Sequence, residues 1–160
     1  MISQDNINQN IKVTCNLASV SILSGGGPFG AIITDQNNKV ISTGVNSVTH
    51  DNDPTAHAEI NAIRNACRIV KKFNLENYIL FTSCEPCPMC LSAIYWSRIK
   101  TVYYENTRTD AKNIGFDDEF IYDELNKDNN EKSIKLYKCN TEYGKKCFDE
   151  WLEKNDKIEY

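Results

Sequence analysis

The run TSCEPCPMC holds three cysteines, Cys84, Cys87 and Cys90, in two overlapping Cys-x-x-Cys spacings. Pro86 disfavours helical backbone in the residue before it, whereas Pro88 is well tolerated at the first position of a helix. We therefore expect Cys87 near the N-cap of a helix and Cys90 near the end of its first turn, where the helix dipole and free N–H groups favour thiolates. Cys84 would end the preceding strand and point elsewhere. The pair Cys87 and Cys90 is thus the better candidate for binding a metal.

The chain has two histidines, His50 and His57, so few candidates exist for a third ligand. His57 lies in TAHAE, two residues before Glu59, in the first turn of a helix that we expect to begin at Pro54 with Asp53 as its N-cap. Residues two apart on a helix do not face the same way. One of the pair can therefore bind a metal while the other lies beside a bound water. His50 lies in the polar loop THDNDP and is expected to be solvated.

His57, Cys87 and Cys90 would supply three protein ligands and leave the fourth tetrahedral position to water, which is the pattern of catalytic zinc sites. Zinc lowers the pKa of such a water, and Glu59 would take its proton and later pass it to a substrate. The alternative is a structural zinc or no metal, with His57 as an ordinary core histidine. We predict the catalytic site, with one Zn²⁺ per subunit.

Composition limits the other functions open to this chain of 160 residues. A hydrophobic content of 41% and a charged content of 25% are ordinary for one globular domain. The net charge of −4 argues against binding of nucleic acid through its phosphates. No apolar run approaches the roughly 18 residues that span a bilayer, and the polar start MISQDNINQN has no signal region. We therefore expect no membrane association.

The seven cysteines form an odd and unevenly spaced set, which does not suggest a disulfide framework. We expect a cytoplasmic protein with reduced thiols. Five cysteines lie outside the predicted metal site and are expected to be small, inert hydrophobic residues: Cys15, Cys67, Cys84, Cys139 and Cys147.

Helical and strand patterns alternate along the chain. Helices are predicted over residues 4–24, 54–73, 87–97, 117–125 and 144–154. Strands are predicted over residues 29–35, 40–46, 78–83, 101–106 and 134–139. This alternation indicates an α/β protein, with one three-layer domain over residues 1–160.

Through His57-Ala-Glu59 and Pro86-Cys87-Pro-Met-Cys90 the sequence resembles the cytidine deaminase-like superfamily of zinc deaminases. The order of the predicted helices and strands fits as well. The resemblance implies a three-layer α/β/α sandwich around a central mixed five-stranded sheet. It also implies an enzyme that displaces ammonia from an amino-bearing ring carbon and leaves a carbonyl.

Three longer segments and a C-terminal tyrosine resemble the bacterial guanine deaminases. The segments are NDPTAHAEINAIRNAC, TSCEPCPMCLSAIYWSRI and GFDDEFIYDEL. This resemblance implies a cytoplasmic enzyme that hydrolyses guanine to xanthine and ammonia. Another zinc deaminase is the first alternative, acting on adenosine in transfer RNA, on cytosine or on cytidine. A non-catalytic zinc-binding domain that binds partners is the second.

The same resemblance assigns substrate contacts by position in its motifs. Phe29 would stack against the purine and Asn46 would hydrogen-bond its edge. Asp118 would accept hydrogen bonds from guanine N–H groups, since an ionised aspartate only accepts. Trp96 would form a wall of the pocket. Tyr160 would lie over the substrate of a partner subunit.

Simpler interpretations exist for most of these residues. Phe29 could be a core aromatic residue, and Asn46 could serve a turn. Asp118 could be an acid favoured by the first turn of a helix. The C-terminal tail that carries Tyr160 could be frayed. In the family the C-terminal segment, here about residues 134–160, is swapped between the subunits of a homodimer, and we expect the same arrangement here.

Overall fold

The computed structural model describes residues 2–159. The chain divides after Phe120 into two compact units, which we describe separately. The first unit holds the following elements: α1 (Gln4–Leu23), β1 (Gly30–Thr34), β2 (Val40–Val45), α2 (Val48–Asp51), α3 (Ala58–Val70), β3 (Ile79–Cys84), α4 (Pro88–Trp96), β4 (Thr101–Asn106) and α5 (Arg108–Asn113). α6 (Glu119–Asn126) begins at the end of this unit.

The first unit contains one mixed sheet with the strand order β2-β1-β3-β4. β1 pairs antiparallel with both β2 and β3, and it places Ala31 opposite Thr82 of β3. β3 and β4 are parallel, with α4 as the crossover between them. In this arrangement β3 is a central strand, and all six of its residues are buried.

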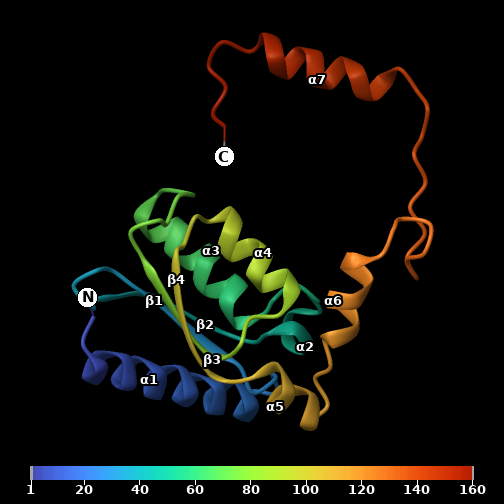
Figure 1. The fold of residues 1–160 in the computed structure, drawn as a ribbon. Coiled ribbons are helices and arrows are strands. Elements are labelled where there is room, and N and C mark those ends of the chain that lie inside the picture. Colours follow the sequence, from blue (N-terminus) through green and yellow to red (C-terminus); the bar gives the residue numbers. More distant parts are fainter. Residues whose placement is uncertain (1, 160) are drawn as a thin grey trace. The chain divides into compact units, whose positions relative to one another are not determined.

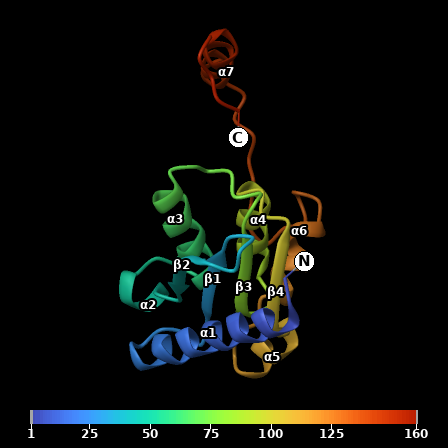
Figure 2. The same ribbon diagram turned by 90° about the vertical axis from the view of Figure 1, so that its left-hand side faces the viewer.

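A layer of helix covers each face of the sheet (Figures 1 and 2), with α1 on one face and α3 and α4 on the other. Successive side chains of a strand point to opposite faces, so the strands divide their apolar residues between two cores. The core on the α1 side includes Ile32, Ile79 and Phe81, packed against Ile7 and Ile11. The core on the α3 side includes Ala31, Ile33 and Leu80, packed with Ala58 and Ala62. These layers confirm the predicted α/β class.

The start of α3 differs from the prediction. Asp53 does not cap a helix that begins at Pro54, because its Oδ1 accepts hydrogen bonds from the backbone N (2.8 Å) and the hydroxyl (2.7 Å) of Thr55. This local turn keeps Pro54 outside the helix. α3 begins at Ala58, with His57 as its N-cap in extended backbone conformation (φ −72°, ψ 157°). His57 is therefore not in the first turn of the helix.

The start of α4 agrees with the prediction. Cys87 is the N-cap, in extended conformation, and Pro88 is the first helical residue. The Cys87 sulfur accepts a hydrogen bond from the backbone N of Cys90 at 3.5 Å. A proline at this position costs no hydrogen bond, because the first N–H groups of a helix have no partner within it.

The second unit, from Ile121 onward, contains the rest of α6 and the helix α7 (Tyr143–Glu153). The prediction of a strand over residues 134–139 is wrong, since this segment has no regular structure. A strand requires a partner for its backbone groups, and the described part of this chain offers these residues none. The sheet therefore has four strands where five were expected. Between residues 2 and 159, no helix is both long and apolar enough to cross a membrane.

Candidate active site

The N-termini of α3 and α4 bring His57, Cys87 and Cys90 together. Their ligand atoms all lie within 4.8 Å of one another. His57 Nδ1 lies 3.6 Å from the Cys87 sulfur and 3.5 Å from the Cys90 sulfur. Ordinary Zn–N and Zn–S bonds at a tetrahedral angle hold nitrogen and sulfur about 3.6 Å apart. The donor types and their spacing thus fit one zinc ion with an open fourth position.

The charges of this group favour metal binding. Hydrogen bonding from Cys90, and then from His57, lowers the pKa of the Cys87 thiol. The same contact with Cys87 raises the pKa of His57, against the effect of burial. Cys87 is thereby held as a thiolate, which is the form that binds metals. A bound zinc ion would take the place of the contact between His57 Nδ1 and the Cys87 sulfur, and it would displace the proton of the Cys90 thiol, whose pKa the hydrogen bond with Cys87 raises.

Glu59 lies in the first turn of α3 and is 5% exposed. Its Oε1 accepts a hydrogen bond from Thr82 Oγ1 at 2.9 Å, and its Oε2 lies 3.4 Å from the Cys90 sulfur. Burial raises the pKa of this carboxyl group. A raised pKa suits a carboxylate that both takes up and releases a proton near neutral pH.

A cavity of about 550 Å³ opens beside this group. His57, Glu59 and Cys87 line it, as do Phe29 and Asn46. Asp118 lines it too, and burial raises the pKa of the Asp118 carboxyl group. The structure thus brings six of the residues singled out in the sequence to one cavity.

Asn46 is fixed in orientation by its neighbours. Its backbone N–H donates to Phe29 O at 3.1 Å, and its backbone oxygen accepts from Ser21 Oγ at 2.9 Å. Its side-chain Oδ1 accepts from the backbone N of Gly27 and of Val48, both at 3.3 Å. Because Oδ1 is occupied in this way, the Nδ2 group is the part of the amide that can donate to a ligand.

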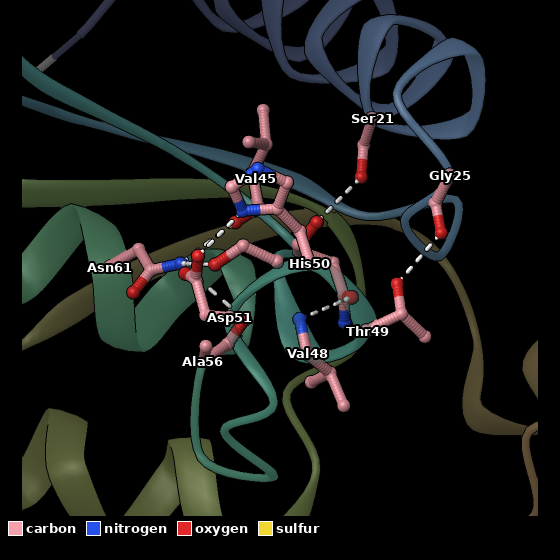
Figure 3. Close-up of polar contacts among 11 residues, drawn as sticks. Ser21, Gly25, Val45, Val48, Thr49, His50, Asp51, Ala56 and Asn61 are labelled. Carbon is pink, nitrogen blue, oxygen red and sulfur yellow. Dashed lines mark hydrogen bonds and ion pairs between the residues drawn. The ribbon is translucent and has the colours of Figure 1, made fainter.

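The segment around Asn46 is tied to α3 and to the end of α1 (Figure 3). Asn61 Nδ2 on α3 donates to Val45 O at 2.9 Å and to Ser47 Oγ at 3.1 Å. Thr49 Oγ1 donates to Gly25 O at 2.7 Å. These contacts hold both sides of Asn46, so the first turn of α3 helps to shape the cavity wall.

Phe116 is a cavity residue that the sequence did not reveal. Its ring meets that of Phe29 edge to face, with centroids 4.9 Å apart and planes at 85°. Such aromatic pairs are favourable and orient both rings. Phe116 directly precedes Asp117 in the segment GFDD. That position was the one available signal for its role.

Arg108 and Glu85 also line the cavity and were not predicted. Arg108 Nη2 lies 2.6 Å from Glu85 Oε1, and the Arg108 backbone N donates to Glu85 Oε2 at 3.0 Å. The hydrogen bond from Arg108 lowers the pKa of Glu85. The pair joins the segment before α4 to the start of α5. Its two residues are 23 positions apart in the chain, so no local sequence pattern indicates that they are in contact.

The two remaining predicted substrate contacts are Trp96 and Tyr160. Trp96 is at the C-terminal end of α4, is 61% exposed and does not belong to the cavity lining. Tyr160 lies outside the described residues. The roles of both residues stay predictions.

The three-layer fold, with the His57, Cys87 and Cys90 group beside a buried glutamate, defines the class of zinc-dependent deaminases. Residues 5–106 match the family model described as the cytidine and deoxycytidylate deaminase zinc-binding region. The chain belongs to this family. The match confirms the resemblance to zinc deaminases and the expectation of a zinc cofactor.

The chain is 46% identical to the guanine deaminase of Bacillus subtilis (strain 168) over 151 residues, covering 94% of this chain and 96% of that protein. An X-ray structure of guanine deaminase from Bacillus subtilis matches with a TM-score of 0.92 and 44% identity over 99% of both chains. A tRNA-specific adenosine deaminase of Buchnera aphidicola subsp. Schizaphis graminum is 40% identical over 130 residues, covering 81% of this chain and 85% of the relative.

Proposed function

We propose that this protein is a zinc-dependent guanine deaminase, which hydrolyses guanine to xanthine and ammonia. The observation that carries the proposal is the similarity to guanine deaminase of Bacillus subtilis over nearly the full length of both chains. The family model ends at residue 106. The similarity to guanine deaminase covers 99% of the chain in structure and so includes the region of Asp118.

His57, Cys87 and Cys90 would hold the zinc ion. A zinc ion with an open position lowers the pKa of a bound water and so supplies a nucleophile near neutral pH. Glu59 would take a proton from the attacking water and pass it to the substrate. The water oxygen would bond to the ring carbon that bears the amino group, one water proton would end on the ring nitrogen beside that carbon and the other on the amino nitrogen, and the bond from the carbon to the amino nitrogen would break, so that ammonia leaves.

The cavity supports guanine as the substrate through its polar groups. Asp118, when ionised, accepts from the N–H groups on the edge of guanine. Asn46 presents its Nδ2 donor, since its Oδ1 already accepts two backbone N–H groups, and it would bind an acceptor atom of the base. Phe29, held by Phe116, would stack on the ring.

A transfer RNA adenosine deaminase is the second candidate, because several relatives of that name match more than half of this chain. Two features weigh against it. Asp118 offers an acceptor, whereas N1 of adenine is itself an acceptor and cannot donate to it. The net charge of −4 also disfavours binding to a large RNA.

A homodimer with exchanged C-terminal segments is part of the proposal. Several apolar side chains of α7 are exposed, including Phe148 (75%), Trp151 (42%) and Leu152 (68%). Apolar residues at this spacing form one face of a helix that normally packs against another surface. A second copy of the chain is the proposed partner, with residues of about 134–160 crossing to it, and Trp96 and Tyr160 acting in the assembled site. We also propose a cytoplasmic location, where the ligand thiols stay reduced.

The function is tested by measuring ammonia release from the purified protein with guanine, adenine, cytosine and cytidine supplied separately. We expect release from guanine alone, with one zinc ion per chain. Release from cytosine or cytidine, or inosine formation only in transfer RNA, would contradict the proposed substrate while keeping the zinc chemistry. Zinc binding without turnover on any of these would support the non-catalytic alternative.

A further inference from the structure

Thr82 is a polar residue at the centre of an apolar strand. It lies in β3. In this strand Ile79 and Phe81 pack in the core on the α1 side, whereas Leu80 packs in the core on the α3 side. Side chains alternate along a strand, so Thr82 points to the same side as Leu80, toward α3. Its side chain is completely buried. Leaving a hydroxyl group without a hydrogen-bond partner in such a position costs free energy.

The partner of Thr82 is Glu59. Thr82 Oγ1 donates to Glu59 Oε1 at 2.9 Å, in a contact that is fully buried. Glu59 Oε2, the other carboxyl oxygen, is the one that lies 3.4 Å from the Cys90 sulfur. The two oxygens of this carboxyl group are therefore not equivalent: one is held by the sheet, and the other faces the zinc-binding group.

We propose that Thr82 is a positioning residue of the deamination, whose hydroxyl group fixes Glu59 Oε1 and so assigns the transfer of the proton to Oε2. This inference rests on the proposed function. The physical reason is that a carboxyl group on a flexible side chain can rotate, and a rotated group would present its proton in the wrong direction. A central strand is a rigid support, and placing a catalytic group within a fraction of an ångström can decide the rate.

The test compares Thr82→Val with Thr82→Ser. Valine has nearly the shape of threonine but cannot form the hydrogen bond, whereas serine keeps the hydroxyl group. With guanine as substrate we expect kcat of Thr82→Val to fall about tenfold or more. KM and the zinc content of one ion per chain should stay close to those of the unchanged protein. Thr82→Ser should recover most of the lost kcat.

Thr34→Val is the matched control. Thr34 is also a fully buried threonine of the same sheet, on β1, but its Oγ1 has no hydrogen-bond partner among the described residues. Its replacement by valine should leave kcat and KM unchanged. Zinc content and melting temperature are measured for every variant, so that a general loss of stability is recognised separately from a loss of turnover.

Several outcomes would contradict the role of Thr82. They are a kcat within twofold of the unchanged protein in Thr82→Val, a loss of zinc or a rise of KM in place of a fall in kcat, or no recovery in a folded Thr82→Ser. Loss of the fold in both Thr82→Val and Thr82→Ala would also contradict it, since the hydroxyl group would then be required for folding. If the unchanged protein releases no ammonia from guanine, the proposed function fails first, and this role fails with it.

Discussion

Gly44 of β2 lies so close to the first turns of α3 that a β-carbon added to it would stand 2.1 Å from the carbonyl oxygen of Ala58 and 2.5 Å from the backbone N of Ala62. These neighbours are backbone atoms of a helix and cannot move aside singly. Gly44→Ala would therefore push α3 away from the sheet, and with it the residues that precede and begin this helix, His57 and Glu59.

We expect Gly44→Ala to lower the free energy of unfolding by about 1–3 kcal/mol, as overpacking in a core does, and to weaken zinc retention. Gly144→Ala is the control, because a β-carbon on this residue of α7 would meet nothing within 4 Å. Denaturant unfolding and zinc analysis of both variants provide the measurement. Equal stability of the two proteins would mean that the approach of β2 to α3 is not as close as described.

Glu59→Gln keeps the size of the side chain but removes its ability to take up and release a proton. We expect zinc content to stay at one ion per chain and kcat for guanine to fall by at least about 100-fold. Cys87→Ser is the comparison, since it removes a metal ligand and should lose both zinc and activity. A Glu59→Gln protein with normal turnover would contradict the role of Glu59 in moving the proton.

Asp118→Asn replaces an acceptor by an amide that also donates, and the Asp118 carboxyl group lines the cavity. We expect kcat/KM for guanine to fall by at least about tenfold. Asp117→Asn is the comparison. Asp117 also lines the cavity, but its Oδ1 accepts from the backbone N of Glu119 and its Oδ2 pairs with Lys112 Nζ at 3.5 Å, so its replacement should affect guanine less. Steady-state kinetics of both variants would contradict the prediction if Asp117→Asn were the more damaging change.

The pH dependence of guanine binding follows from the environment of Asp118, because burial raises the pKa of this carboxyl group. A protonated carboxyl group carries an O–H donor on one oxygen, so the better acceptor of hydrogen bonds from guanine is the ionised form. That form is lost as pH falls through the pKa, and a raised pKa makes the loss begin at a higher pH than for an exposed aspartate. We therefore expect KM for guanine to rise on the acid side. In Asp118→Asn this rise should be absent, at pH values where zinc is retained.

Asn61 holds the segments on both sides of Asn46, through Val45 and Ser47 (Figure 3). Asn61→Ala should loosen this cavity wall and raise KM for guanine about threefold to tenfold, with little change in zinc content. Asn65→Ala is the matched control. Asn65 lies about one turn further along α3 and donates to Thr43 O at 3.0 Å, away from Asn46. Equal effects of the two variants on KM would contradict a specific role for Asn61.

The zinc-binding group could be predicted from the sequence because its determinants are local. The proline residues around Cys87 decide where a strand stops and a helix starts, and the structure places Cys87 at the N-cap with Pro88 as the first helical residue. The combination of His57 and Glu59 with the pair Cys87 and Cys90 further restricted the possible chemistry to that of a catalytic zinc site. The alternation of helices and strands likewise predicted the α/β class.

Local patterns failed where two interactions competed for the same residue. Asp53 is a residue type that often caps helices, but its carboxylate accepts hydrogen bonds from Thr55 in a turn. The helix therefore begins at Ala58 and leaves His57 in extended conformation. Residues 134–139 had the composition of a strand, yet a strand forms only where a partner offers hydrogen bonds.

The sequence by itself determined which groups can bind a metal and move a proton, since residue types and short spacings specify them. The tertiary structure decided what surrounds them. Thr82 and Glu59 are 23 residues apart in the chain, as are Glu85 and Arg108, and only the pairing of strands and the packing of helices brings each pair together. Contacts of this kind depend on the register and direction of every element between the two residues, and no local pattern in the sequence carries that information.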